Sequence, residues 1–398
     1  MKTKLMPLVA TVLTAVTGAA YAQSSVTLYG LIDEGVLYNT NAKGGRQYAI
    51  TNSTAQGDRW GLIGKEDLGG GLQAIFRLEN GFNVETGALE QGGAEFGRQA
   101  YVGLAGKFGQ VTFGRHYDPI VDSVSGYILA GSTHQGGAGQ IGGVFSSHPG
   151  DMDNLDNSYR VNNSIKYYSP VFDGFQGVAL YSVGGAAGDY SRNQIWALSA
   201  SYNLGSFSAG AAFEKINEPN FSLFGNNPSS SATGNNMTAT PVYSGYASAK
   251  SQQIVTAGAS YAFGAFSIAA VYSNVRFSDL GAVGGGVLNP NNLSGTAVFN
   301  TGELNVGYRI TSSWMVGLGY TYTQGTSFDS LPAAKYKQIN IGTDYILSKR
   351  TDLFATCGYQ RASGYDSTLK PAVASIYTAT PSASNSQLVA VVGIRTKF

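Results

Sequence analysis

Apolar and polar residues alternate along most of the chain with a period of two. The segment from Ser313 to Thr323 shows this most clearly, because Trp314, Leu318 and Tyr322 share one face while small or polar residues occupy the other. This period is that of a β-strand whose two faces meet different surroundings. It recurs in sixteen segments and predicts an all-β protein. The predicted strands are residues 26–38, 58–68, 72–79, 98–104, 110–115, 160–169, 174–183, 194–204, 207–215, 253–263, 266–277, 299–310, 314–323, 337–347, 351–360 and 387–398.

The connections between these strands alternate in length. Seven are short, and the other eight are mostly long and rich in Gly, Asn and Ser. This rhythm is typical of an up-and-down barrel with tight turns on one rim and long loops on the other, whereas a soluble sandwich would not confine its long connections to alternate positions. In lipid every strand edge has to be paired. We therefore predict a 16-stranded antiparallel transmembrane β-barrel, wide enough to hold an aqueous channel.

One stretch, about residues 116–159, breaks the alternation. It is rich in Gly and Ser and ends in three acids, Asp151, Asp153 and Asp156. A stretch of this length is either a linker between two domains or a functional loop. Five predicted strands precede it and eleven follow, so a linker would leave two open sheets in lipid. We therefore interpret it as one long loop of a single barrel, bent into the lumen.

Composition supports a membrane barrel and excludes several other classes. Only 12% of the residues are charged, 54 are Gly and 25 are Tyr, yet the mean hydropathy is close to zero. Strands with an apolar outer face and a polar inner face produce such an average. The net charge of +1 gives no indication of nucleic-acid binding. The single Cys357 excludes an intramolecular disulfide and gives no paired redox or metal motif.

The two ends of the chain carry export and assembly signals. Lys2 and Lys4 precede an apolar run, and a small-residue site ends at Ala22, which predicts a signal peptide over residues 1–22 and a barrel domain over 23–398. A membrane anchor is the alternative, but the apolar run is too short for one. The terminal Phe398 resembles the signal by which outer-membrane barrels meet their assembly machinery. This resemblance implies a bacterial outer-membrane location.

Motifs for catalysis, cofactors or metals are weak. Gly137-Ala-Gly139-Gln-Ile-Gly142 has dinucleotide-type spacing but neither follows a strand nor opens a helix. The three histidines, at positions 116, 134 and 148, match no short metal-ligand motif, although one of them would be available to a Ser-His-acid hydrolase site. Glu66-Asp67 adjoins a turn, where paired carboxylates more often solvate a rim. We predict no enzyme activity, no cofactor and no metal.

Short motifs spread over the mature chain resemble one known family. They are Ser-Val-Thr-Leu-Tyr-Gly at 25–30, Arg-Trp-Gly-Leu at 59–62, Glu-Asp-Leu-Gly-Gly at 66–70, Phe-Gly-Arg-Gln-Ala-Tyr-Val-Gly-Leu at 96–104, Gly-Arg-His-Tyr-Asp at 114–118, Asn-Asn-Ser-Ile-Lys-Tyr at 162–167 and Gly-Ile-Arg-Thr-Lys-Phe at 393–398. Together they resemble the trimeric general porins of Gram-negative outer membranes, especially the beta-proteobacterial branch. The resemblance implies a homotrimer. It also implies that residues 115–160 are the third extracellular loop, folded inward to form a constriction.

The same resemblance implies a set of constriction residues. The wall cations are Arg59, Arg98 and Arg160, with Arg77 where a neutral amide is commoner and Ile63 where a Lys is often found. The opposing acids come from the loop: Asp118, Asp122, Asp151, Asp153 and Asp156. The alternation independently points Arg59 and Arg77 into the lumen, since a lipid-facing Arg costs about 2–4 kcal/mol at the midplane. Arg98 alternates in phase with the apolar residues Ala100 and Val102, so the pattern leaves its direction open unless a bulge intervenes. For each of these arginines the alternative is a position at the rim of the barrel, outside the constriction.

The predicted function is passive diffusion of ions and small hydrophilic solutes through a water-filled pore. The alternatives are a substrate-specific channel with a saturable site at the third loop, to which Tyr101, Tyr127 and Phe145 would contribute, and an adhesive barrel without conduction. Expected partners are two further copies of the chain, outer-membrane lipids and lipopolysaccharide, the barrel-assembly machinery, and the solutes themselves. Deletion of residues 131–150 is expected to raise conductance. The sign of the ion selectivity stays open.

Overall fold

The computed structural model describes residues 24–129, 147–156 and 158–398. The predicted signal peptide with its cleavage site at Ala22, His134, Phe145 and most of the segment proposed for deletion lie outside the described residues. The strands are β1 (Ser25–Ala42), β2 (Gly45–Asn52), β3 (Arg59–Gly69), β4 (Leu72–Gly81), β5 (Gln99–Gly106), β6 (Gly109–His116), β7 (Val161–Tyr168), β8 (Phe175–Ser182), β9 (Ile195–Leu204), β10 (Phe207–Asn217), β11 (Ser251–Phe263), β12 (Phe266–Leu280), β13 (Gly295–Arg309), β14 (Trp314–Gln324), β15 (Lys335–Ile346), β16 (Thr351–Ser363) and β17 (Ser386–Lys397). The helices are α1 (Pro119–Ser123), α2 (Pro219–Ser222) and short 3-10 turns at Gln91–Gly93, Ser125–Tyr127, Pro149–Asp151, Ser244–Tyr246 and Gly286–Leu288.

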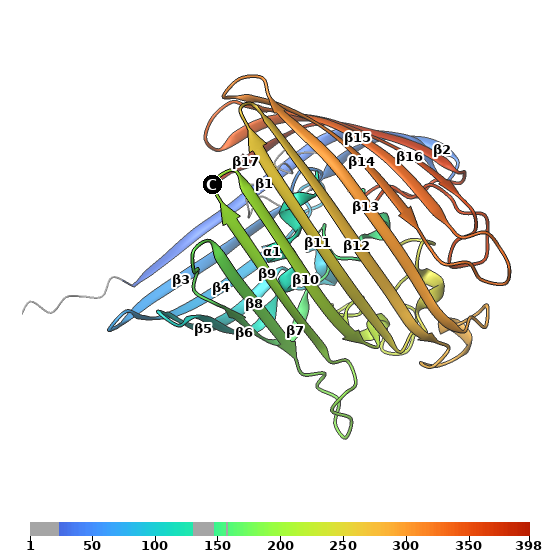
Figure 1. The fold of residues 1–398 in the computed structure, drawn as a ribbon, viewed down its shortest axis with the longest axis horizontal. Coiled ribbons are helices and arrows are strands. Elements are labelled where there is room, and N and C mark those ends of the chain that lie inside the picture. Colours follow the sequence, from blue (N-terminus) through green and yellow to red (C-terminus); the bar gives the residue numbers. More distant parts are fainter. Residues whose placement is uncertain (1–23, 130–146, 157) are drawn as a thin grey trace, which may run out of the picture.

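The strands form one closed antiparallel sheet (Figure 1). Each strand from β3 to β17 pairs with the next, and β1 closes the ring by pairing with β17 along one edge and with β3 along the other. The ring therefore contains β1 and the fifteen strands β3 to β17, which makes sixteen. The predicted 16-stranded barrel is confirmed.

The seventeenth strand, β2, adds no further position to this ring, because it pairs with the same edge of β1 as β3 does. It folds back on β1 and pairs with the upper part of that strand, Glu34 to Ala42, beyond the part that pairs with β3. The sequence prediction treated residues 39–57 as a loop. The sequence signal of β2 is weak because the strand is short and is flanked by Gly and Asn, although its large side chains, Tyr48 and Ile50, alternate outward.

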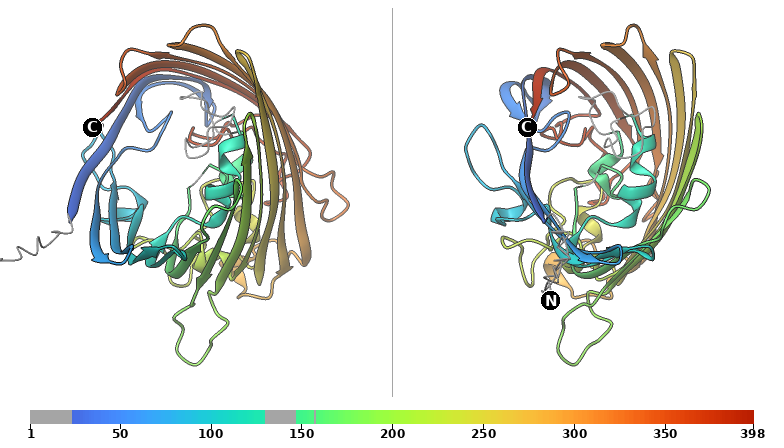
Figure 2. Two further views of the ribbon diagram at one scale, coloured as in Figure 1. Left: turned by 60° about the vertical axis from the view of Figure 1, so that its left-hand side comes forward. Right: turned by 90° about the vertical axis from the view of Figure 1, so that its left-hand side faces the viewer.

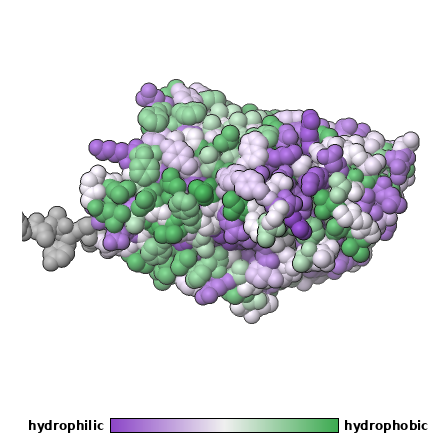
Figure 3. Space-filling model, turned by 90° about the horizontal axis from the view of Figure 1, so that it is seen from below, coloured by the Kyte–Doolittle hydropathy of each residue, from purple (hydrophilic) through white to green (hydrophobic). Residues whose placement is uncertain are grey.

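The two faces of the wall differ as the alternation predicts. On β14, Leu318 and Tyr320 are about half exposed on the outer face, whereas Thr321 and Thr323 on the inner face are buried. Hydrophobic residues gather toward one end of the surface and hydrophilic residues toward the other, where the long loops lie (Figure 3). None of the helices in the described ranges has the length and hydrophobicity of a membrane-crossing helix.

Several of the long loops pack together at one rim. Tyr246, in the connection between β10 and β11, places its ring against Phe277 of β12, Phe299 of β13 and Phe328 of a later loop. Tyr243 of the same connection contacts Phe224. These aromatic contacts close part of the rim with a hydrophobic cluster.

The described first part of the segment that breaks the alternation, residues 119–129, lies inside the barrel. Figure 2 shows α1 within the ring of strands, and α1 packs against β9 and β10. Wall glycines leave room for it, because a Cβ at Gly258 would lie 2.9 Å from the ring of Tyr127, and one at Gly319 would lie 2.9 Å from Leu129. Part of the glycine content of the inner faces is therefore explained by the close approach of this segment to the wall.

Candidate functional site

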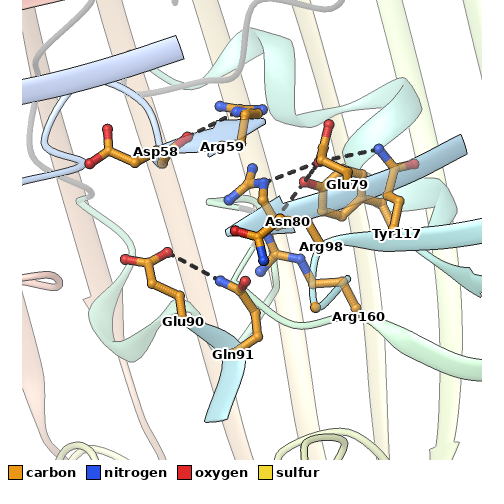
Figure 4. A network of polar contacts seen from close by, with 12 residues as sticks. Asp58, Arg59, Glu79, Asn80, Glu90, Gln91, Arg98, Tyr117 and Arg160 are labelled. Atoms are coloured by element: carbon orange, nitrogen blue, oxygen red, sulfur yellow. Dashed lines mark hydrogen bonds and ion pairs between the residues drawn. The ribbon is translucent and has the colours of Figure 1, made fainter. Parts of the chain in front are cut away.

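Four arginines converge on one side of the lumen. Arg59 opens β3, Arg77 lies in β4, and Arg98 and Arg160 immediately precede β5 and β7. Figure 4 shows Arg59, Arg98 and Arg160 gathered about the Glu79 carboxylate and the Tyr117 ring. The structure thus brings together the predicted arginines, with an acid and a tyrosine that sequence reasoning did not select.

The registers of the strands explain the direction of Arg59. It pairs with Leu31 of β1 and Gly81 of β4, and its Nε donates to the carbonyl of Gly57 over 2.9 Å. Arg98 reaches the lumen differently. Its backbone N–H donates a hydrogen bond to the carbonyl of Glu79. Arg98 lies one residue before β5 begins, so the alternation of inward and outward side chains along β5 does not determine its direction.

Glu79 is the hub of this cluster. Its carboxylate lies 3.1 Å from the Arg98 Nε and 3.2 Å from an Arg77 nitrogen, and it accepts hydrogen bonds from the hydroxyls of Tyr117 and Tyr29 at 3.0 and 2.6 Å. Its side chain is almost completely buried. A buried carboxylate with this many donors is held in its charged form and in a fixed orientation.

The cations outnumber the acids at this site. Glu79 is shared between Arg77 and Arg98, whereas Arg59 and Arg160 have no carboxylate within ion-pair distance among the described residues. The residues outside the described ranges, 1–23, 130–146 and 157, contain no Asp or Glu. Arg160 instead lies over the ring of Tyr117, with its guanidinium carbon 4.7 Å from the centroid. The site therefore carries net positive charge.

The predicted loop acids are engaged elsewhere. Asp118 caps α1 by accepting from the backbone N–H groups of Ile120 and Val121, and burial raises its pKa to about 6. Asp122 pairs with Lys166 of β7 at 2.5 Å. Neither carboxylate is ion-paired with any of the four arginines in the described part of the chain.

The described parts of this inner segment form two limbs, residues 116–129 and residues 147–156, and the other three acids lie in the second limb. Asp151 accepts from the backbone N–H groups of Asp156 and Ser158, and burial together with the nearby carboxylates of Asp156 and Asp153 raises its pKa well above the usual range. Asp153 contacts His148 at 2.5 Å and accepts from the Ser273 hydroxyl. Asp156 is partly buried beside this group. The expected array of loop carboxylates facing arginines is thus not the arrangement observed.

Several residues of the site had no place in the sequence prediction. Glu79, Lys166 and Glu303 all lie on the inner faces of their strands, where a charged side chain opposite an apolar one is a detectable signal. His148 matches no motif, and nothing in its sequence context shows that it is buried. Among residues 24–129, 147–156 and 158–398, no group of His, Cys, Asp and Glu has metal-site geometry.

A closed 16-stranded wall, an apolar outer face and a charged interior define an outer-membrane β-barrel channel. The family described as Gram-negative porin matches residues 9–365, and the chain belongs to this family. It is 31% identical to outer membrane porin protein 32 of Delftia acidovorans, over 98% of this chain and 99% of that protein. It is 39% identical to an outer membrane porin protein of Bordetella pertussis over 184 residues, 42% of this chain and 45% of that protein. A solved anion-selective porin from Comamonas acidovorans is 25% identical, with a TM-score of 0.69 over 94% of this chain and all of that one.

Membership in this family establishes what the protein does. It is an outer-membrane porin that forms a diffusion channel, and porins are not enzymes. The predictions of fold class, function and bacterial outer-membrane location are confirmed.

Proposed function

We propose that the passage is narrowest between the arginine cluster and the first limb of the inner segment, and that it favours anions. The observation that carries this proposal is the charge balance at the cluster, where Arg59 and Arg160 lack carboxylate partners. The constriction residues proposed are Arg59, Arg77, Arg98 and Arg160. Glu79 sets how much of their charge remains free.

Electrostatics supports this selectivity. Low-dielectric walls focus the field of fixed charges into a water-filled lumen and raise the local concentration of counter-ions. Four of the loop acids are engaged by other groups: Asp122 by Lys166, Asp153 by His148, and Asp118 and Asp151 by backbone N–H groups. The solved relative from Comamonas acidovorans is itself described as anion-selective, which agrees with the proposal.

Two finer features of the protein are also proposals. We infer that residues 1–22 form the export signal, so that residues 23–398 form the mature barrel and Phe398 serves in its assembly. We also infer a homotrimer, because porins are typically trimeric and a solved trimer form of OmpT from Vibrio cholerae shares the fold. Lipids and lipopolysaccharide would contact the part of the outer barrel surface that the trimer interface does not cover.

Single-channel recording in planar bilayers tests the proposed function. Conductance should rise almost in proportion to salt concentration, and under a KCl gradient the reversal potential should have the sign of a chloride-preferring pore. Current that saturates with one solute would favour the substrate-specific alternative. A potassium preference would overturn the proposed selectivity.

A further inference from the structure

The second limb of the inner segment, residues 147–156, is fastened to the wall opposite the arginine cluster. Three consecutive strands hold it. Gln252 of β11 donates its side-chain amide to the carbonyl of Met152 over 2.7 Å, and Ser273 of β12 donates its hydroxyl to Asp153 over 2.5 Å. The third strand, β13, contributes Glu303.

His148 lies at the centre of this attachment. Its Nδ1 is 2.5 Å from Asp153, on the same limb, and its Nε2 is 3.4 Å from Glu303, on the wall. All three side chains are almost completely buried. A protonated imidazole between two carboxylates leaves each carboxylate with a partner, whereas a neutral imidazole leaves both buried charges poorly compensated.

Glu303 also binds the end of the first limb. Its Oε1 accepts the backbone N–H of Leu129 over 2.6 Å, and Asn305 donates to the same oxygen and to the carbonyl of Tyr127. Its other oxygen accepts from Ser147 and from Thr321 of β14. One wall carboxylate therefore ties down both limbs of the segment.

We propose that His148, bridging Asp153 and Glu303, is a positioning residue that pins the inner segment against the far wall and so fixes the width of the passage. The second half of this inference rests on the proposed function, in which the segment borders the narrowest part of the pore. The charged groups that contact the imidazole are Asp153 on the limb and Glu303 on β13. The hydroxyls of Ser147, Ser273 and Thr321 bind these two carboxylates.

The pin depends on protonation. Burial by itself would lower the pKa of His148, but the carboxylates of Asp153 and Glu303 outweigh burial and raise that pKa well above its usual range. The stabilising contribution is therefore complete below about pH 6.5, the ordinary pKa of histidine, persists at neutral pH and is lost as pH rises through the raised value. The attachment of residues 147–156 through His148 should therefore weaken only at alkaline pH.

The test combines a structural readout with a functional one. Hydrogen exchange of the peptide spanning residues 147–156 reports the attachment. Single-channel conductance reports the width of the passage, and open-channel current noise reports fluctuations of that width. His148→Ala should raise the exchange of this peptide roughly tenfold or more, since a buried ionic network loses its central cation. His148→Lys should restore protection and should keep it at an alkaline pH where the natural protein loses it.

His116→Gln is the matched control. His116 is also buried, but it bonds Ser164 on the neighbouring strand and touches neither Asp153 nor Glu303. It should leave exchange of residues 147–156 unchanged. Unchanged exchange in His148→Ala would overturn the pin. Raised exchange with unaltered conductance and noise would support the pin and would contradict the proposed place of the segment at the narrowest point.

Discussion

The two sides of the lumen handle charge in opposite ways. On the side formed by β3, β4 and the starts of β5 and β7, Glu79 pairs with two of the four arginines, Arg77 and Arg98. On the side formed by β11, β12 and β13, the acids of the inner segment and of the wall surround one histidine. On the first side, Arg59 and Arg160 leave positive charge facing the water-filled passage. On the second side, the acids hold the inner segment to the wall.

This difference shows that a count of charged residues does not give the field inside a pore. The chain as a whole has a net charge of +1, and the inner segment is visibly acidic. Asp118, Asp151 and Asp153 are nevertheless occupied by helix capping, backbone N–H groups and His148. An acid that satisfies buried donors contributes little to a field felt by passing ions.

The largest effect is expected when the hub of the cationic side is removed. Glu79→Leu should lower the free energy of unfolding by about 3–5 kcal/mol, because Arg77 and Arg98 lose a buried counter-charge. Chemical unfolding in detergent micelles measures this value. Glu66→Gln, at an exposed position near the β3–β4 turn, is the control and should leave stability unchanged. A loss below about 1 kcal/mol, the size of an exposed ion pair, would show that Glu79 is not the hub.

A smaller effect is expected beside the cluster, at Asp58. This carboxyl accepts the backbone N–H of Asp33, and burial raises its pKa to about 7. An acid with a raised pKa destabilises the folded state increasingly between about pH 4 and 7. Asp58→Asn should therefore stabilise the protein at pH 8 by about 1–2 kcal/mol, after allowance for solvent screening, and by almost nothing at pH 4. Equal effects at both pH values would contradict the raised pKa.

Removal of one uncompensated cation should change selectivity more than stability. A unit charge about 4 Å from a passing ion contributes about 1 kcal/mol in water, about five-fold for each ion, and with opposite sign for anions and cations. Arg59→Ala should therefore lower the anion-to-cation permeability ratio at least about five-fold at low salt. Arg276→Ala removes an exposed arginine of β12 and should leave the ratio unchanged. Equal changes in the two variants would mean that rim charges, not the cluster, set selectivity.

The smallest effect is expected for an acid of the inner segment. Asp151→Asn should leave the permeability ratio within experimental error, because this buried side chain accepts backbone N–H groups and faces no arginine. Reversal potentials under the same gradient measure it. A clear rise in anion preference would place Asp151 in the field of the passage and would weaken the contrast between the two sides.

The barrel could be predicted because a period of two and a short–long rhythm are written locally in the sequence. The inward direction of Arg59 and Arg77 followed from the same period. The direction of Arg98 did not, because this residue lies just before β5, where strand parity no longer applies. The partners of Asp153 could not be predicted either, since Ser273 and Glu303 are more than a hundred residues away in the chain.

The central claim is that Arg59 and Arg160 leave the passage electropositive. The most direct test is the reversal potential of the natural protein and of the double variant Arg59→Ala, Arg160→Ala, recorded in planar bilayers under one KCl gradient. The natural protein should prefer chloride, and the double variant should lose most of that preference while keeping its conductance. A natural protein that prefers potassium, or a double variant with an unchanged reversal potential, would contradict the account.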